Sequence, residues 1–118
     1  MALTNKNIVV IGGTSGIGLA TAVQAKAAGA SVWAASRSED KIQAASAAYP
    51  DIQFSQVDTH DPEGLSALFK SIGTIDHIVG AATGATRTQA PFMSQTADQF
   101  QAAFDKFWGY THVVRAGQ

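Results

Sequence analysis

The sequence predicts an α/β protein in which helices cover a parallel β-sheet. Short apolar stretches of strand length alternate with stretches of helical pattern, as in consecutive βαβ units. The first apolar stretch runs directly into a glycine-rich segment and then into an Ala-rich helical one. The length of 118 residues allows one domain, and 46% hydrophobic residues with 14% charged residues describe a globular chain with a substantial core.

The strands are expected where Val, Ile and aromatic residues concentrate. Their predicted ranges are 7–11, 31–36, 52–57 and 75–81. A helix over 16–28 follows the first strand and ends at Gly29, because glycine readily adopts the left-handed conformation that follows a helix.

The remaining helices carry start and stop signals. The second is predicted over 38–49, since the residue before Pro50 disfavours helix. The third begins after Asp61, which can cap it, with a proline at its first position. The fourth starts at Thr96, with Gln99 completing a capping box, and is expected to extend to Ala116.

The glycine-rich segment is the most informative feature for function. A strand that ends in such a turn and opens a helix directs backbone N–H groups and a positive dipole end to one point, which favours a phosphate. Leu19 and Ala20 follow Gly18, where the P-loop of a nucleoside triphosphatase needs Lys and Ser or Thr. The segment therefore indicates a dinucleotide cradle.

Composition excludes several other classes. A formal net charge of -1 with scattered Lys and Arg predicts no nucleic-acid partner and no anionic membrane surface. No apolar stretch is long enough for a membrane span, and the absence of Cys fits a reducing compartment, so a cytoplasmic location is expected. The three His residues lack the spacing of metal ligands, and no metal is predicted.

With these elements assigned, the chain resembles the amino-terminal half of the short-chain dehydrogenase/reductase family over nearly its whole length. The family motif T-G-x-x-x-G-x-G is matched by Gly12, Gly16 and Gly18, while Ile11 replaces the leading Thr. We expect Gly12 to allow the tight turn, Gly16 the approach of backbone to pyrophosphate, and Gly18 close packing of helix on strand. The resemblance implies a partial Rossmann-like sheet in the order 3-2-1-4 and a nicotinamide dinucleotide cofactor.

The end of the second predicted strand indicates which dinucleotide is bound. A carboxylate there would accept hydrogen bonds from a ribose 2′-OH, whereas an Arg pairs with a 2′-phosphate. This chain has Ser36 and Arg37, which favour NADP(H), with Thr14 and Ser15 assisting at the phosphate. The alternative interpretation of Arg37 is a solvated side chain at a strand end.

Two further loops complete the expected cofactor site. The resemblance implies that Asp58 holds the adenine amino group with Val57 beside the ring, although an Asp after a strand is also typical of a turn or cap. The segment 80–83 stands where the family has N-N-A-G, and the register of this loop is open because Gly84 can replace the missing glycine. The complete predicted cofactor-binding set comprises Gly12, Thr14, Ser15, Gly16, Ile17, Gly18, Ser36, Arg37, Val57, Asp58, Ala81, Ala82 and Thr83.

The predicted catalytic set is less complete than the cofactor-binding set. Lys106 stands where the family's N-x-x-G motif has a catalytic Asn, and it is either a polar link in a proton relay or a solvent-facing helix residue. The family's Y-x-x-x-K pair is absent, since Tyr49 is followed four residues later by Gln53 and Tyr110 by Val114. The family's catalytic Ser is not expected in this chain either.

The resemblance therefore implies a single truncated domain over 1–118. It would be the cofactor-binding half of an NADP(H)-dependent oxidoreductase that acts on a small alcohol or carbonyl substrate in the full-length protein, and would be inactive alone. The alternative is a non-catalytic dinucleotide-binding module, or a half-domain that assembles with a partner. An apolar edge strand at 75–81 and the helix at 96–116 predict a homo-oligomer.

Overall fold

The computed structural model describes residues 1–82 and 89–118. Its elements are β1 (Asn7–Ile11), α1 (Gly16–Ala27), β2 (Ser31–Ser36), α2 (Glu39–Ala48), β3 (Gln53–Gln56), α3 (Pro62–Ile72), β4 (His77–Gly80), the 3-10 turn η1 (Phe92–Ser94), α4 (Ala97–Ala102) and α5 (Asp105–Ala116). The four strands form one parallel sheet in the order β3-β2-β1-β4, which confirms the predicted α/β Rossmann-like topology.

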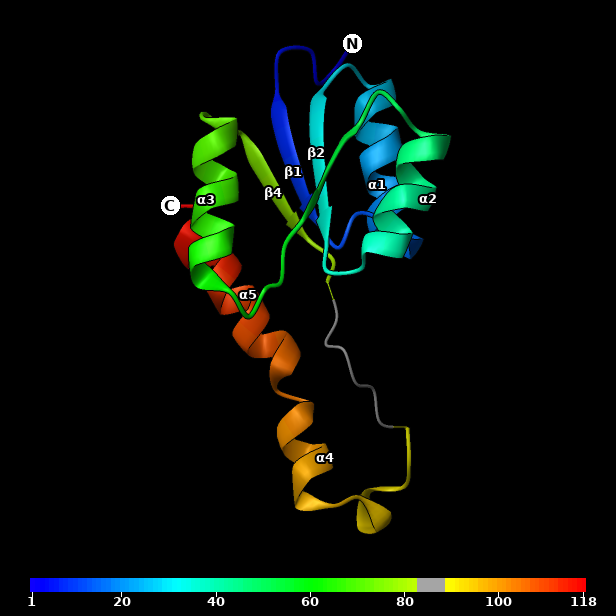
Figure 1. The fold of residues 1–118 in the computed structure, drawn as a ribbon, viewed down its shortest axis with the longest axis vertical. Helices are drawn as coiled ribbons and strands as arrows, with labels where there is room; N and C mark the ends of the chain where they lie inside the picture. Colours follow the sequence, from blue (N-terminus) through cyan, green and yellow to red (C-terminus); the bar gives the residue numbers. More distant parts are fainter. Residues whose placement is uncertain (83–88) are drawn as a thin grey trace.

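Strand β1 lies inside the sheet and is buried on both faces. Ile8 and Val10 belong to a core cluster with two Ala residues of α1, whereas Val9 and Ile11 belong to a second cluster with residues of α3 and α5. Because side chains alternate along a strand, one apolar stretch supplies both cores. The helices α1 and α2 accordingly lie on one face of the sheet, and α3 and α5 on the other (Figure 1).

The predicted helix signals act where they were expected. Gly29 follows α1 with φ +101°. The carboxylate of Asp61 accepts a hydrogen bond from the Gly64 N–H at 3.1 Å at the start of α3. The Ser38 hydroxyl, which was not among the predicted signals, caps α2 by accepting the Lys41 N–H. At α4, Thr96 and Gln99 form both bonds of the capping box. These local residues therefore determine where three helices begin.

Two strands are shorter than predicted at both ends. The Ile52 N–H donates to the carbonyl of Tyr49, and β3 begins only at Gln53. At β4, the Asp76 carboxylate and N–H both bond the backbone of Asn7, and the strand begins one residue later. The apolar residues next to these strands still contribute to the core.

The prediction of one helix from Thr96 to Ala116 is wrong. The structure has two helices, α4 and α5, separated at Ala103 and Phe104. Helix α5 buries Gly109 and Val113 against the sheet layer, whereas α4, all of whose residues the structure describes, buries none. With no packing face to hold it in line, α4 projects beyond the sheet, which gives the molecule extents of 50 × 29 × 25 Å (Figure 1).

Candidate functional site

The glycine-rich loop between β1 and α1 is held by backbone contacts on two sides. The N–H groups of Gly12 and Gly13 both donate to the carbonyl of Ala35 at the end of β2, at 2.8 and 3.2 Å. Gly12 has φ +87°, and a Cβ there would lie 2.5 Å from the Ala82 nitrogen. The loop therefore requires glycine at this position for both conformation and space.

The other two motif glycines face different surroundings. A Cβ on Gly18 would collide with the carbonyl oxygen of Gly12, so this glycine allows α1 to approach the loop. At Gly16, which has φ +56°, an added Cβ would meet no atom of the described residues within 4 Å beyond its chain neighbours and its own helix backbone. The first turn of α1 also carries no acidic residue. Backbone and helix end at Gly16 are thus open to a negatively charged group.

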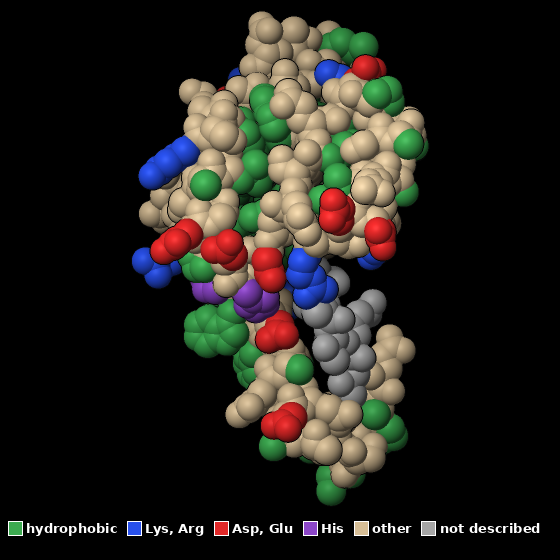
Figure 2. Space-filling view, viewed as in Figure 1, with side chains coloured by type: hydrophobic (Ala, Val, Ile, Leu, Met, Phe, Trp, Pro, Cys, Tyr) green, Lys and Arg blue, Asp and Glu red, His purple; other side chains and the backbone are tan. Residues whose placement is uncertain are grey.

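A cleft of about 730 Å³ runs along the carboxyl ends of the strands. Twelve of the predicted cofactor-binding residues line it, namely Gly12, Thr14, Ser15, Gly16, Ile17, Gly18, Ser36, Arg37, Val57, Asp58, Ala81 and Ala82. Such a crevice at the carboxyl edge is the usual ligand site of open α/β sheets. Figure 2 shows basic, acidic and His side chains gathered along the border where the strands end.

The turn after β2 presents two cations to this cleft. The Ser36 hydroxyl accepts a hydrogen bond from the Ser38 N–H at 3.2 Å, and Gln56 donates from its side chain to the carbonyl of Arg37 at 3.1 Å. These bonds hold the backbone and leave the Arg37 side chain exposed. Lys41, in the first turn of α2, lines the cleft as well.

The loop after β3 forms a further wall. Val57 is buried and its N–H donates to the carbonyl of Ser36 at 3.0 Å. The Asp58 carboxylate accepts the His60 N–H at 2.8 Å, so Asp58 has the turn role that an Asp after a strand commonly takes. Its side chain is half-buried and borders the cleft, where it can also face a ligand.

The end of β4 brings the last predicted residues to the glycine loop. The Ala81 N–H donates to the carbonyl of Ile11 at 2.7 Å, which extends the pairing of β1 with β4 by one residue. Ala81 and Ala82 therefore lie directly against Gly12. The predicted residue Thr83 lies outside the described part of the chain.

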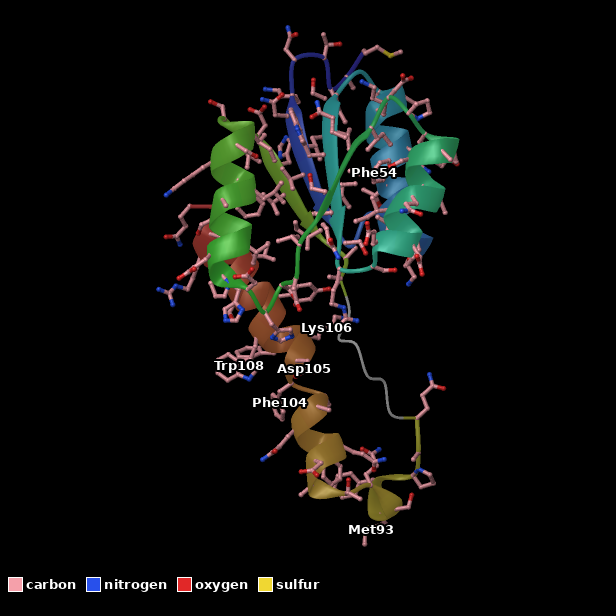
Figure 3. The ribbon with its side chains drawn as sticks, viewed as in Figure 1. Phe54, Met93, Phe104, Asp105, Lys106 and Trp108 are labelled. Atoms are coloured by element: carbon pink, nitrogen blue, oxygen red, sulfur yellow. The ribbon has the colours of Figure 1, made fainter. Side chains whose placement is uncertain are left out.

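Lys106, the predicted catalytic residue, does not line the cleft. It lies on α5 with an exposed side chain (Figure 3). Its Nζ is 5.6 Å from the centre of the Tyr110 ring. The Tyr110 ring in turn packs against Gly80, where an added Cβ would lie 3.2 Å from ring atom Cε1. Lys106 is thus connected to the end of β4 through Tyr110.

Six cleft residues are absent from the sequence prediction: Ile11, Ala35, Ser38, Lys41, Thr59 and His60. Lys41 lies in the first turn of the helix that follows Arg37, and a second cation so close in sequence to the predicted phosphate-binding Arg could have identified it. Thr59 and His60 have no such signal, since only the fold of the β3–α3 loop brings them to the cleft.

Comparison with known proteins identifies the fold's relatives. The sequence profile of the short chain dehydrogenase family matches residues 6–117. The chain belongs to the short chain dehydrogenase family. An L-xylulose reductase of Mesocricetus auratus is 30% identical to it over 105 residues, which are 89% of this chain and 42% of that protein.

Solved structures of the short chain dehydrogenase family agree with this assignment. One, described as a short chain dehydrogenase/reductase family protein, is 31% identical with a TM-score of 0.85, covering 99% of this chain and 50% of that one. A short-chain type dehydrogenase/reductase from Mycobacterium ulcerans shares the fold at 21% identity, with a TM-score of 0.88 over 99% of this chain and 46% of that one. This chain spans about half the length of these relatives.

Membership places the chain in a family of oxidoreductases that use nicotinamide dinucleotides. The glycine cradle fits such a group, because Gly12 and Gly18 close the loop while the space beside Gly16 stays open. Within residues 1–82 and 89–118, no group of three or more potential metal ligands comes together. In the same ranges, no helix combines the length and apolarity that crossing a bilayer requires.

Proposed function

We propose that this chain is the NADP(H)-binding part of an oxidoreductase that transfers hydride between NADP(H) and a small alcohol or carbonyl compound. Under this proposal, residues 1–118 form one truncated cofactor-binding domain. The observation that carries the proposal is the placement of Arg37 and Lys41 on the same cleft as the glycine loop. Two cations beside Ser36 favour a 2′-phosphate over a bare ribose hydroxyl.

Each wall of the cleft has a proposed role in holding the cofactor. The open backbone at Gly16 and the start of α1 would accept the pyrophosphate. Ile17, 83% exposed in the structure, would be covered by the bound dinucleotide. Val57 and Asp58 would receive the adenine, while Ala81, Ala82 and the predicted Thr83 would lie along the nicotinamide ribose.

The chemistry needs more than a bound cofactor. Reduction of a carbonyl also requires a proton donor at the substrate oxygen. Neither Tyr49 nor Tyr110 is followed by Lys at the family's spacing, and these are the two tyrosines of the chain. We therefore propose that the chain holds the cofactor without turnover on its own, with Lys106 as a polar link in the proton relay of a complete enzyme.

The test is a titration of NADPH and NADH against the wild type and Arg37→Asp. A charge-assisted bond contributes about 1.5–3 kcal/mol, so the variant should bind NADPH at least roughly tenfold more weakly. Its affinity for NADH should stay equal or rise, because a carboxylate suits a ribose 2′-OH. Arg115→Asp, the same charge change at the exposed end of α5, is the control. Equal NADPH affinity in the wild type and Arg37→Asp would contradict the assignment.

A second candidate function is a non-catalytic dinucleotide-binding module, or a half-domain that assembles with a partner. Two observations favour it: Lys106 stands where the family has Asn, and the segment 80–83 departs from the family's N-N-A-G. An intact-mass measurement on the natural protein separates the two, since 12.3 kDa favours the module and about twice that mass favours the enzyme.

We further propose a cytoplasmic homo-oligomer that binds neither nucleic acid nor membranes. The composition supports this, with no Cys and a near-neutral formal charge of -1. The edge strand β4 and the exposed aromatic side chains at the start of α5 are the surfaces proposed for self-association.

A further inference from the structure

The β3–α3 loop, residues 57–61, is tied to the fold by hydrogen bonds on several sides. Towards β2, the Val57 N–H donates to Ser36. Towards α3, the Asp61 carboxylate accepts the Gly64 N–H. Within the loop, the Asp61 N–H donates to the carbonyl of Asp58 at 2.9 Å. The loop is therefore a compact turn rather than a loose connection.

A further tie comes from α5, a helix 53 residues away along the chain from the loop residue it contacts. The His112 ring nitrogen Nδ1 lies 2.7 Å from the carbonyl oxygen of Thr59 in a partly buried setting. One turn earlier on α5, Gly109 lies so close that an added Cβ would be 2.6 Å from the Thr59 hydroxyl. The loop after β3 accordingly lies directly against α5 (Figure 1).

The chemistry of this contact determines the state of the ring. A carbonyl oxygen only accepts, so Nδ1 of His112 must carry a proton and donate. The ring of His60 then meets His112 edge-on, with centroids 6.1 Å apart. Thr59 is thus held against α5 by the hydrogen bond from His112 and by its close packing on Gly109.

From these contacts we infer that His112 is a positioning residue for the adenine end of the cofactor site. Its bond to Thr59 holds the turn that carries Asp58 at the cleft, and the same bond fixes α5, which carries Lys106 two turns earlier. This inference rests on the proposed function in one respect, namely that the turn at Asp58 receives an adenine nucleotide. It does not depend on the choice between NADP(H) and NAD(H).

The test compares His112→Leu and His112→Asn in the full chain. Leu keeps apolar bulk without a donor, whereas the Asn amide can donate to Thr59 from nearly the position of Nδ1. Affinities for adenosine 5′-monophosphate and nicotinamide mononucleotide are measured by NMR titration. Amide hydrogen exchange of His60 and Asp61 is measured without nucleotide. His77→Leu, an exposed His at the start of β4, is the matched control.

Loss of one net hydrogen bond predicts roughly fivefold weaker binding of the adenine nucleotide to His112→Leu and about fivefold faster exchange of the two amides. His112→Asn should restore both values to near the wild type, and nicotinamide mononucleotide should bind equally to all variants. His77→Leu should match the wild type throughout.

Three results would overturn the inference: unchanged adenine-nucleotide affinity in His112→Leu, equal losses for both mononucleotides, or no measurable adenine-nucleotide binding by the wild type. Because adenosine 5′-monophosphate lacks a 2′-phosphate, the outcome is separate from that of Arg37→Asp. A wild type that prefers NADH would end the NADP(H) proposal and leave this inference intact if His112→Leu still loses adenine affinity.

Discussion

The glycine loop and the α4–α5 segment differ in how they are held. The loop at Gly12 is enclosed by the end of β2 on one side and by Ala82 on the other, with close contacts made by backbone. Helix α4, within the described part of the chain, buries no side chain, and the start of α5 exposes Phe104, Phe107 and Trp108 by 54–60%. The conformation of the loop depends on glycines that are visible in the sequence, so it is predictable from local sequence. The position of a helix that lacks a packing face is not, because no local signal determines it.

The largest expected contrast is between the core beneath the sheet, against which the glycine loop is built, and the exposed α4–α5 segment. Leu65 of α3 is fully buried, at 0% exposure, and Leu65→Ala should lower the free energy of unfolding by about 2–5 kcal/mol. Phe104, 60% exposed, is the contrast, and Phe104→Ala should change it by less than about 0.5 kcal/mol. Urea unfolding followed by circular dichroism measures both. Similar losses in the two variants would mean that α4 and α5 pack more tightly than the structure shows.

Within the glycine loop, two substitutions should separate folding from binding. Gly12→Ala combines a left-handed backbone with a clash against Ala82, and should cost about 2–5 kcal/mol of stability. Gly16→Ala places its methyl group in open space, so its cost should be only the roughly 1–2 kcal/mol of backbone strain, while dinucleotide affinity falls. Thermal unfolding and NADPH fluorescence titration report the two effects. If Gly16→Ala binds NADPH as the wild type does, the pyrophosphate does not lie at Gly16.

A smaller effect is expected at the second cation of the cleft. Lys41→Gln should weaken NADPH binding by roughly three- to fivefold and leave NADH unchanged, because one exposed charge next to a phosphate contributes up to about 1 kcal/mol. Lys6→Gln, at the opposite edge of the sheet, is the matched control. Equal losses for NADPH and NADH would assign Lys41 to stability rather than to the 2′-phosphate.

The smallest effect on stability, within about 0.5 kcal/mol, is expected for Trp108→Gln, since this side chain is 54% exposed. Its effect should appear in assembly instead. We expect the wild type to sediment as a dimer or larger species and the variant to shift towards monomer, measured by sedimentation velocity at several concentrations. A monodisperse wild-type monomer at high concentration would contradict the proposed self-association.

The sequence predicted the strands and the helix starts because these depend on local signals. Asp61 caps α3 and Thr96 caps α4 with neighbours three residues away. The order of the strands followed from a resemblance over the whole chain, which the family match confirms. Strand ends were predicted less well, since Ile52 is apolar and buried yet engaged in a turn.

The cleft was predictable only in part. The residues of the glycine loop and Arg37 follow strands directly, so their position at the carboxyl edge was foreseeable. Thr59 and His60 reach the cleft through a turn whose shape depends on α3 and α5. The break after α4 was equally unpredictable, because it depends on the absence of packing rather than on a helix-breaking residue at Ala103. The roles of the cleft residues in binding remain predictions.

The central claim is that this chain binds NADP(H) at the carboxyl edge of its sheet. The most direct measurement is a calorimetric titration of the wild-type chain with NADPH and with NADH under one set of conditions. We expect saturable 1:1 binding of NADPH that is at least roughly tenfold tighter than that of NADH, from the charge-assisted contacts at Arg37. Tighter binding of NADH, or no binding of either dinucleotide, would contradict the claim.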